Sequence, residues 1–139
     1  MKEIWKAIPT WEDKYEISNK GRVRSLSCKI TYYRPDLKVV HQRIFPGRIL
    51  SAGITQKGYF LVVFSRRSKT KPQYVHQLVA KAFVGPRPEG LEIRHLNGNP
   101  RDNRPINLKY GTTKENAQDT IKHRKQKHRR QNEQHNNPR

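Results

Sequence analysis

The sequence has few acidic residues, a single cysteine and no long apolar run. Its 139 residues include 11 Asp or Glu against 30 Lys or Arg, a formal net charge of +19. The lone Cys28 excludes an internal disulfide and the paired Cys-x-x-Cys sites that hold structural zinc. No apolar segment is long enough to span a membrane, and no apolar stretch follows the N-terminus as in a signal peptide. We therefore expect a cytoplasmic protein without a disulfide framework.

The low hydrophobic content, 32% of the residues, predicts a small core, because typical globular domains contain roughly 45–50%. A chain of this length forms one compact domain or two small subdomains, here followed by a tail. Residues 124–139 lack hydrophobic side chains. For this segment we expect a fraying helix followed by disorder.

Basic residues are concentrated in two parts of the chain. Between Asp36 and Glu89 every charged residue is Lys or Arg, and a second basic block covers residues 122–130. Each phosphate that Lys or Arg neutralises releases condensed counterions, so this surplus favours a nucleic-acid partner. The alternative is a merely solubilising surface, but such surfaces usually mix the two signs of charge.

The N-terminal segment predicts a β-hairpin. Apolar and polar residues alternate on both sides of an Asn-Lys-Gly turn at residues 19–21. Gly21 can take the positive φ that such a turn requires. The second strand then places Arg22 and Arg24 on the face opposite Val23. In this basic context we favour phosphate contact for both arginines over an unpartnered position in solvent.

Two further segments precede the candidate site. Residues 66–71 form a basic run without hydrophobic periodicity, so we expect a mobile, exposed loop that grips a nucleic-acid backbone by charge. Its basic residues are Arg66, Arg67, Lys69 and Lys71. Residues 74–83 carry apolar side chains at helical spacing and predict an amphipathic helix. His76, near the start of that helix, is expected to be structural or to position substrate.

Residues 91–116 predict a strand, a turn-rich loop, a second strand and a helix. The first strand ends at His95, and the loop over 96–105 is dense in Asn, Asp, Gly and Pro, the residues of ordered turns. Asn107 begins the second strand and is expected to tie the loop together, which would orient His95. Thr112, followed three residues later by Glu115, is a capping box at the start of the helix.

The helix places Asn116, Asp119 and His123 on one face, because they lie at i, i+3 and i+7. His95, Asn107 and Asn116 follow one another at intervals of 12 and 9 residues. This arrangement lets the imidazole and the Asn116 amide face each other across a phosphate. A neutral imidazole can accept a proton from water, and amide or carboxylate oxygens suit Mg²⁺.

Three segments resemble a known family. Residues 94–116, RHLNGNPRDNRPINLKYGTTKEN, resemble the catalytic motif of HNH (His-Me finger) endonucleases. The helix predicted over 74–83 resembles the one that precedes the catalytic hairpin in related phage nucleases. The N-terminus is similar to the NUMOD-type DNA-binding module of phage and intron homing endonucleases. The residues that match it are Ile4-Trp5, Ile8, Tyr15-Glu16-Ile17-Ser18-Asn19, Gly21 and Val23-Arg24-Ser25.

The resemblance implies an α+β fold in three parts. These are a small β-rich, DNA-gripping module over 1–72, an HNH ββα-metal motif with its preceding helix over 73–124, and a basic, disordered tail over 125–139. The implied partner is DNA, in a bacterial host or phage-infected cell, with no membrane and no small-molecule cofactor. Protein partners stay open, phage packaging and replication proteins among them.

The resemblance also implies roles for individual residues. His95 would be the general base, Asn107 a further catalytic-site residue that fixes the loop, and Asn116 the ligand of one divalent cation. That cation would be Mg²⁺ or another such as Mn²⁺, with Asp119 as a further candidate ligand. Phosphate contacts are expected from Arg94, Arg101 and Arg104, in addition to the basic residues named above.

One position departs from the family pattern. Many homing-type relatives have Asp immediately before the catalytic histidine, where it is a second metal ligand, and this chain has Arg94. Because a cation cannot bind Mg²⁺, the site works with Asn116 alone, recruits Asp119 or has lost activity. We prefer the single-ligand version, with Arg94 as a phosphate clamp that also helps keep His95 unprotonated.

Three functions stay open from the sequence. The leading one is a Mg²⁺-dependent HNH DNA endonuclease or nickase. The second is a non-catalytic DNA-binding protein on a decayed HNH scaffold, for which Arg94 is the main argument. The third is an RNA-binding or ribosome-associated basic protein, which the charge favours and the His/Asn spacing does not.

Overall fold

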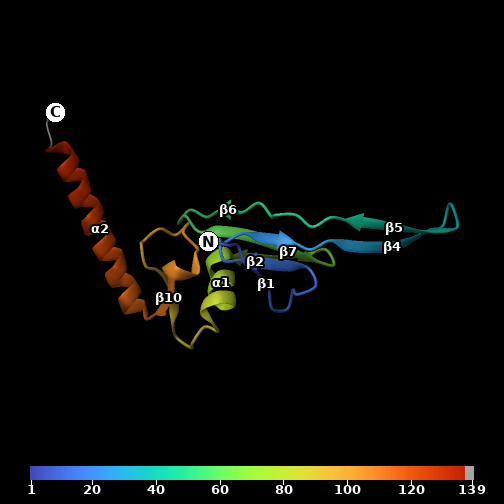
Figure 1. Ribbon diagram of the computed structural model, residues 1–139, viewed down its shortest axis with the longest axis horizontal. Helices are drawn as coiled ribbons and strands as arrows, with labels where there is room; N and C mark the ends of the chain where they lie inside the picture. The colour runs from blue at the N-terminus through green and yellow to red at the C-terminus, as the bar shows by residue number, and fades with distance from the viewer. Residues whose placement is uncertain (137–139) are drawn as a thin grey trace.

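The computed structural model describes residues 1–136, which form four small antiparallel sheets and two α-helices (Figure 1). The first sheet contains β1 (Trp5–Ala7), β2 (Tyr15–Ser18) and β3 (Val23–Ser25), and the second is a ribbon of β4 (Cys28–Arg34) and β5 (Val39–Phe45). The third contains β6 (Gly53–Ile54), β7 (Phe60–Arg66) and β8 (Lys69–Tyr74), and the fourth contains β9 (Glu92–His95) and β10 (Leu108–Gly111).

The helices follow the third and fourth sheets. Helix α1 (Val75–Val79) continues into a π-helical turn, η1 (Ala80–Val84), and a 3₁₀ turn, η2 (Pro105–Asn107), leads into β10. Helix α2 (Thr113–His135) follows β10 directly. The segment from β9 to α2 therefore has the strand, loop, strand, helix order that was predicted, and the mixed content confirms the α+β class.

The predicted N-terminal hairpin is present as β2 and β3, with Ile17 opposite Val23. Gly21 takes φ 76° in its turn, and a Cβ there would lie 3.1 Å from the Cβ of Asn103. A side chain at this position would be strained by the backbone and would press on Asn103. The turn of the N-terminal sheet thus packs directly against the loop that precedes β10.

The prediction of a mobile basic loop at residues 66–71 is wrong. Strand β7 continues to Arg66 and β8 begins at Lys69, so only Arg67 and Ser68 form the turn. Their φ values of 48° and 61° are both positive, the pattern of the tight primed turns that match strand twist. The turn lacks the usual glycine, and this is why the sequence indicated a loop. The basic residues of this segment lie on an ordered hairpin tip.

The ribbon of β4 and β5 extends away from the body of the molecule, at the opposite end from α2 (Figure 1). The two strands pair from Cys28 opposite Phe45 to Arg34 opposite Val39. Nearly all of its side chains are exposed. The ribbon therefore adds little to the core.

One hydrophobic cluster holds the sheets and α1 together. Its aromatic part stacks Tyr15 on Phe64 at 4.3 Å between ring centroids, with Trp11 tilted against both. The buried apolar members are Ile8, Tyr15, Ile17, Val23, Val62, Phe64, Val75, Leu78, Val79, Ala80 and Leu108. Because these residues come from both sides of position 72, the two sequence modules predicted to meet there share one core.

Helix α2 begins at the predicted capping box, in which Thr112 and Glu115 each accept a hydrogen bond from the other's backbone N–H. It then leaves the body of the molecule with no buried residue (Figure 1). Disorder was predicted from residue 125, but residues 125–135 are helical. Lys, Arg, Gln and Glu are good helix formers, which accounts for the difference. Residues 137–139 of the predicted tail lie outside the described residues.

Neither helix within residues 1–136 combines the length and the apolar character that crossing a membrane requires.

Candidate active site

Strand β9 presents two faces with different surroundings. Glu92 and Arg94 point to α2 and bond with its side chains, and we call them the helix face. Ile93 and His95 point the other way, to the core and to the rings of Tyr59 and His76, and we call them the cavity face. The alternation follows from the two-residue period of a strand. One short strand therefore carries both the contacts of α2 and the candidate base.

His95 is held by one hydrogen bond, in which its Nε2 lies 3.0 Å from Oδ1 of Asn103. Asn103 is buried, with 4% of its surface exposed. Since Oδ1 can only accept, the bond places the proton of the neutral ring on Nε2 and leaves the lone pair on Nδ1. Burial lowers the pKa of His95, and the bond to Asn103 opposes part of this shift. The ring is therefore neutral and fixed in one tautomer near pH 7.

The loop before β10 is held by its own Asn and Asp side chains. Asn107 is buried, accepts from the backbone N–H of Asn97 at 2.9 Å and donates to the backbone oxygen of Asp102 at 2.8 Å. Asn97 in turn donates to the Asp102 carboxylate at 2.8 Å. These bonds fix the backbone on both sides of Asn103. Asn107 thus ties the two ends of the loop together, as predicted from the sequence.

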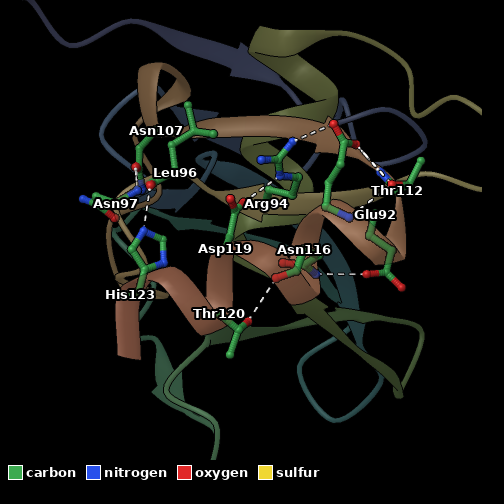
Figure 2. A network of polar contacts seen from close by, with 11 residues as sticks. Glu92, Arg94, Leu96, Asn97, Asn107, Thr112, Asn116, Asp119, Thr120 and His123 are labelled. Atoms are coloured by element: carbon green, nitrogen blue, oxygen red, sulfur yellow. Dashed lines mark hydrogen bonds and ion pairs between the residues drawn. The ribbon is translucent and has the colours of Figure 1, made fainter. Parts of the chain in front are cut away.

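Three residues of α2 contact β9 and the residue after it, in matching order (Figure 2). Asn116 Nδ2 donates to Glu92 at 2.9 Å, and Asp119 accepts from Arg94 at 2.7 Å. One turn further along, the Nε2 of His123 lies 3.1 Å from the backbone oxygen of Leu96. The face of α2 that was predicted from the i, i+3, i+7 spacing is therefore the face that docks on β9.

Arg94, which was predicted to clamp phosphate, is paired with two carboxylates on the helix face. Its guanidinium bonds to Asp119 and lies 3.3 Å from Glu115, and 14% of its side chain is exposed. These two carboxylates raise the pKa of Arg94, and Arg94 lowers the pKa of Asp119. Asp119 also lines the cavity that contains His95 and Asn116, and its bond to Arg94 engages one of its two carboxylate oxygens.

His95 and Asn116 line the same cavity, which has a volume of about 350 Å³. Lys57 and Tyr59 from the β6–β7 turn complete its wall opposite α2. An adjoining cavity of about 510 Å³ shares Tyr59 and Asn116 and also includes His76. The imidazole of His95 and the amide of Asn116 therefore lie in the same cavity, as predicted.

The residues present fit a divalent ion held by a single protein ligand. Within residues 1–136, no three His, Cys, Asp or Glu side chains are grouped so that they could hold a metal ion. Asn116 donates a hydrogen bond from Nδ2 to Glu92, and its Oδ1 has no hydrogen-bond partner within residues 1–136. Mg²⁺ keeps several waters and takes one or two protein oxygens together with substrate phosphate. An amide oxygen beside a neutral histidine meets that requirement.

Several of the arginines predicted to contact phosphate form ion pairs within the chain. Arg24 bonds to Glu16 at 2.6 Å and lies over the Trp5 ring, and Arg22 is paired with Glu3. Arg66 pairs with Asp13 at 2.5 Å and Arg104 with Asp102 at 2.7 Å. The remaining predicted contacts are exposed, and they are Arg67, Lys69, Lys71 and Arg101.

The β7–β8 hairpin tip lies far from His95. Tyr59 and Tyr74 stand beside the cavities, at the other end of the same two strands. Arg66 lies six positions after Phe60 along β7, which is about 20 Å at the usual rise per residue. The basic tip can therefore bind a distant part of a nucleic acid, and it lies outside the candidate active site.

Sequence reasoning missed Asn103, Glu92 and Tyr59. Asn103 carried a weak signal, because it lies in the turn-rich loop beside Asp102, but the loop gave no sign of which amide meets His95. Glu92 and Tyr59 carried none, since their roles depend on where α2 and the β6–β7 turn pack. His76 was noted on its helix, and the structure places its ring 5.4 Å from that of His95.

Comparison with known proteins matches the two parts of the chain to two family models. Residues 3–65, from β1 through nearly all of β7, match the NUMOD4 motif. Residues 73–118, from the end of β8 to the first turns of α2, match the HNH endonuclease family. Together the two matches include His95, Asn103, Asn107 and Asn116, whereas Asp119, Thr120 and His123 lie beyond them.

Individual relatives match the chain across both parts. The DNA endonuclease I-HmuI of Bacillus phage SP01 is 30% identical over 117 residues, which are 84% of this chain and 57% of that protein. The uncharacterized HNH endonuclease L247 of Acanthamoeba polyphaga mimivirus is 32% identical over 123 residues, 86% of this chain and 26% of that protein. The solved structure of I-HmuI superposes with a TM-score of 0.64 at 28% identity, over 86% of this chain and 58% of that one. The chain thus spans little more than half the length of I-HmuI.

Proposed function

Because the chain belongs to the HNH endonucleases that carry a NUMOD4 module, we propose that it is a divalent-metal-dependent DNA endonuclease or nickase. The observation that carries this proposal is the cavity that His95 and Asn116 share. On one wall is a neutral imidazole in a fixed tautomer, and on the other an amide oxygen without a partner among the described residues. Phosphodiester hydrolysis needs a base of this kind beside a position for a cation.

His95 acts as the general base. Its Nδ1 carries the lone pair and accepts a proton from the water that attacks phosphorus, after which the ring is an imidazolium. Oδ1 of Asn103 then faces the Nε2–H of the charged ring, which it stabilises. A lowered pKa keeps His95 in its reactive, neutral form at physiological pH. General-base catalysis of this type contributes about 10²–10⁴-fold in rate.

Asn116 would hold the divalent ion through Oδ1. When bound, such an ion stabilises the charge that develops on phosphate and leaving-group oxygens. The orientation of the amide is set by Glu92, because a carboxylate accepts a hydrogen bond only from the Nδ2 end. Thr113 donates to the other oxygen of Glu92 at 3.2 Å. Glu92 therefore keeps Oδ1 directed away from itself and ready for a ligand.

DNA is the proposed substrate. I-HmuI is described as binding and cleaving DNA, and the present chain matches it across both of its modules. The net charge of +19 supports binding to a polyanion. Lys57 in the cavity wall and Arg101 on the loop next to His95 are exposed and can contact phosphates near the reacting group.

A second candidate is a DNA-binding protein that has lost cleavage. The observation in its favour is Arg94, whose guanidinium lies on the helix face where relatives have an acidic metal ligand, and whose partner Asp119 is thereby occupied. This candidate retains DNA binding and loses Mg²⁺-dependent hydrolysis.

Incubation with supercoiled plasmid separates the two candidates. We expect the purified chain to convert plasmid to nicked or linear DNA with Mg²⁺ or Mn²⁺, and to leave it intact with EDTA. DNA binding in EDTA, followed by fluorescence anisotropy, shows that the protein is folded and competent. Binding without cleavage in the presence of either metal would establish the second candidate and refute the first.

A further inference from the structure

His76 is a second imidazole beside His95, and the proposed mechanism does not use it. Its ring centroid lies 5.4 Å from that of His95, with the two rings edge to face. Tyr59 and Tyr74 flank it at 5.0 and 5.5 Å. Helix α1 fixes its position, because the neighbouring Val75 and Val79 are fully buried in the core. The ring is thus held at the boundary of the two cavities that meet at Tyr59.

The two nitrogens of His76 have different surroundings. Nδ1 is buried and has no hydrogen-bond partner within the described residues. His76 also lines the cavity of about 510 Å³, so Nε2 is the nitrogen at its surface. A proton on Nδ1 would be a buried donor without an acceptor, an arrangement that folded proteins rarely contain. The neutral ring therefore carries its proton on Nε2, directed to the cavity.

His76 is neutral near pH 7 and can therefore act as an uncharged hydrogen-bond donor. Burial, together with a smaller contribution from the adjacent His95, lowers its pKa to about 4. A second imidazolium next to His95 would make that base harder to protonate. As a neutral ring, His76 can contact an anion without changing its own charge between pH 5 and 8.

The cavity around His76 is complementary to an anion. Lys57 and Arg87 are basic, and Tyr59, Tyr74 and Gln77 add side chains that can donate hydrogen bonds. Its acidic member, Glu92, is already bonded to Asn116 and Thr113. The chemistry of this wall fits the non-bridging oxygens of a phosphodiester.

We propose that Nε2–H of His76 donates a hydrogen bond to a non-bridging oxygen of the DNA phosphate that reacts beside His95. The contact holds the phosphate against the base and stabilises the charge that its oxygens gain during attack. This inference rests on the proposed nuclease function and adds to it a residue that touches the substrate. His95 moves the proton, and His76 binds the oxygen.

The test compares His76→Phe and His76→Gln with the unchanged protein in single-turnover cleavage of supercoiled plasmid. Phe keeps an aromatic ring between the tyrosines and removes the donor, whereas Gln keeps an amide N–H near the position of Nε2. Loss of one donor to a transition-state oxygen costs about 10²–10³-fold in rate. We expect His76→Phe to be slower by about 10²-fold and His76→Gln to recover at least about tenfold of that loss.

A second readout does not depend on cleavage. Long-range ¹H–¹⁵N spectra of the histidine-labelled protein report which ring nitrogen carries the proton. We expect His76 to be neutral at pH 6 with its proton on Nε2, and its Nε2 signal to shift when duplex DNA is added in EDTA. His128, exposed on α2, is the matched control, and its signals should not change when His76 is replaced.

Each outcome decides the inference. Wild-type cleavage by His76→Phe, an equal loss in folded Phe and Gln variants, or a proton on Nδ1 overturns it. If His76→Phe does not fold, the rate of His76→Gln is the deciding measurement. A rate within about tenfold of wild type supports the inference, and a loss of about 10²-fold contradicts it. If the unchanged protein does not cleave, the proposed function has failed, and the shift of the Nε2 signal on DNA alone decides this inference.

Discussion

The helix face and the cavity face of β9 differ in how fully their polar groups are paired. On the helix face, Glu92 and Arg94 meet partners on α2 at 2.7 to 3.3 Å. On the cavity face, His95 has a partner at Nε2, and the neighbouring His76 has no partner at the buried Nδ1 within residues 1–136. Buried polar groups without partners cost free energy. Unpaired polar groups beside a cavity are expected on a face that binds substrate. A face that docks a helix pairs its polar groups with that helix.

Because of this difference, we expect substitutions on the two faces to change different properties of the protein. Ion pairs near the surface contribute up to about 1 kcal/mol each, so changes at Arg94 should affect stability slightly and chemistry little. Glu92 differs, because it orients the amide of Asn116. Changes on the cavity face remove groups that act on the reacting atoms, and they should affect the rate. Asn116 is the exception, because it docks on Glu92 through Nδ2 and offers Oδ1 to the cavity.

The largest effect is expected from Asn116→Ala. Loss of a group that places a metal ion removes several kcal/mol of transition-state stabilisation, which is on the order of 10³-fold in rate. Calorimetric titration with Mn²⁺ should also show weaker binding. Asp119→Ala is the matched control on the same face of α2 and should lose less of both. If Asp119→Ala proves more damaging, the two residues exchange their roles as metal ligand.

A smaller loss is expected from Asn103→Leu, which removes the partner of His95 with little change in side-chain volume. Partners that set the tautomer and orientation of a functional histidine are typically worth about 10–100-fold. Single-turnover rates measure the effect, and Asn99→Leu on the exposed part of the same loop is the control. Equal rates for Asn103→Leu and wild type would show that His95 does not depend on this bond.

The pH dependence tests the cavity face without any substitution. His95 must be neutral to accept a proton, so the rate should rise with pH through the pKa of His95 and then level off. Burial lowers that pKa, and the rise should therefore be centred below the ordinary histidine value of about 6.5. On the acid side, the rate should fall by at most about tenfold per pH unit. A midpoint above that value would contradict the desolvated site.

The smallest effect on chemistry is expected at the β7–β8 hairpin tip. Replacing Arg66, Arg67, Lys69 and Lys71 with Ala should weaken binding to all DNA sequences by a similar factor. The slope of log K against log salt should flatten by about 0.9 for each phosphate that the variant no longer neutralises. Arg66 is paired with Asp13 and should contribute least. Cleavage at saturating DNA should stay near wild type, because the tip is distant from His95; weaker binding to one sequence alone would show that the tip reads bases.

The sequence predicted the parts of the site that local patterns specify. The capping box at Thr112 placed the start of α2, and the helical spacing of Asn116, Asp119 and His123 identified the face that docks on β9. Strand alternation placed His95 at the end of β9. Each of these depends on residues within a few positions of one another, which is why the pattern alone was sufficient.

The remaining features depend on tertiary packing. Asn103, the loop asparagine that meets His95, packs against the turn at Gly21 from a distant part of the chain, a contact that local patterns do not indicate. Arg94 was expected at phosphate because the sequence shows its charge and not its partners on α2. The basic segment at 66–71 lacked a glycine, and strand pairing between β7 and β8 imposed a tight turn that its composition did not indicate.

The most direct test of the account is the single-turnover cleavage rate of His95→Ala, measured with its DNA affinity in EDTA. The imidazole is required to move a proton and not to hold the substrate. We therefore expect the rate to fall by about 10²–10⁴-fold while the affinity stays near that of the wild type. Asp119→Ala, measured in parallel, should retain most of its rate. Wild-type-like cleavage by a folded His95→Ala protein would contradict the assignment of the chemistry to the cavity face.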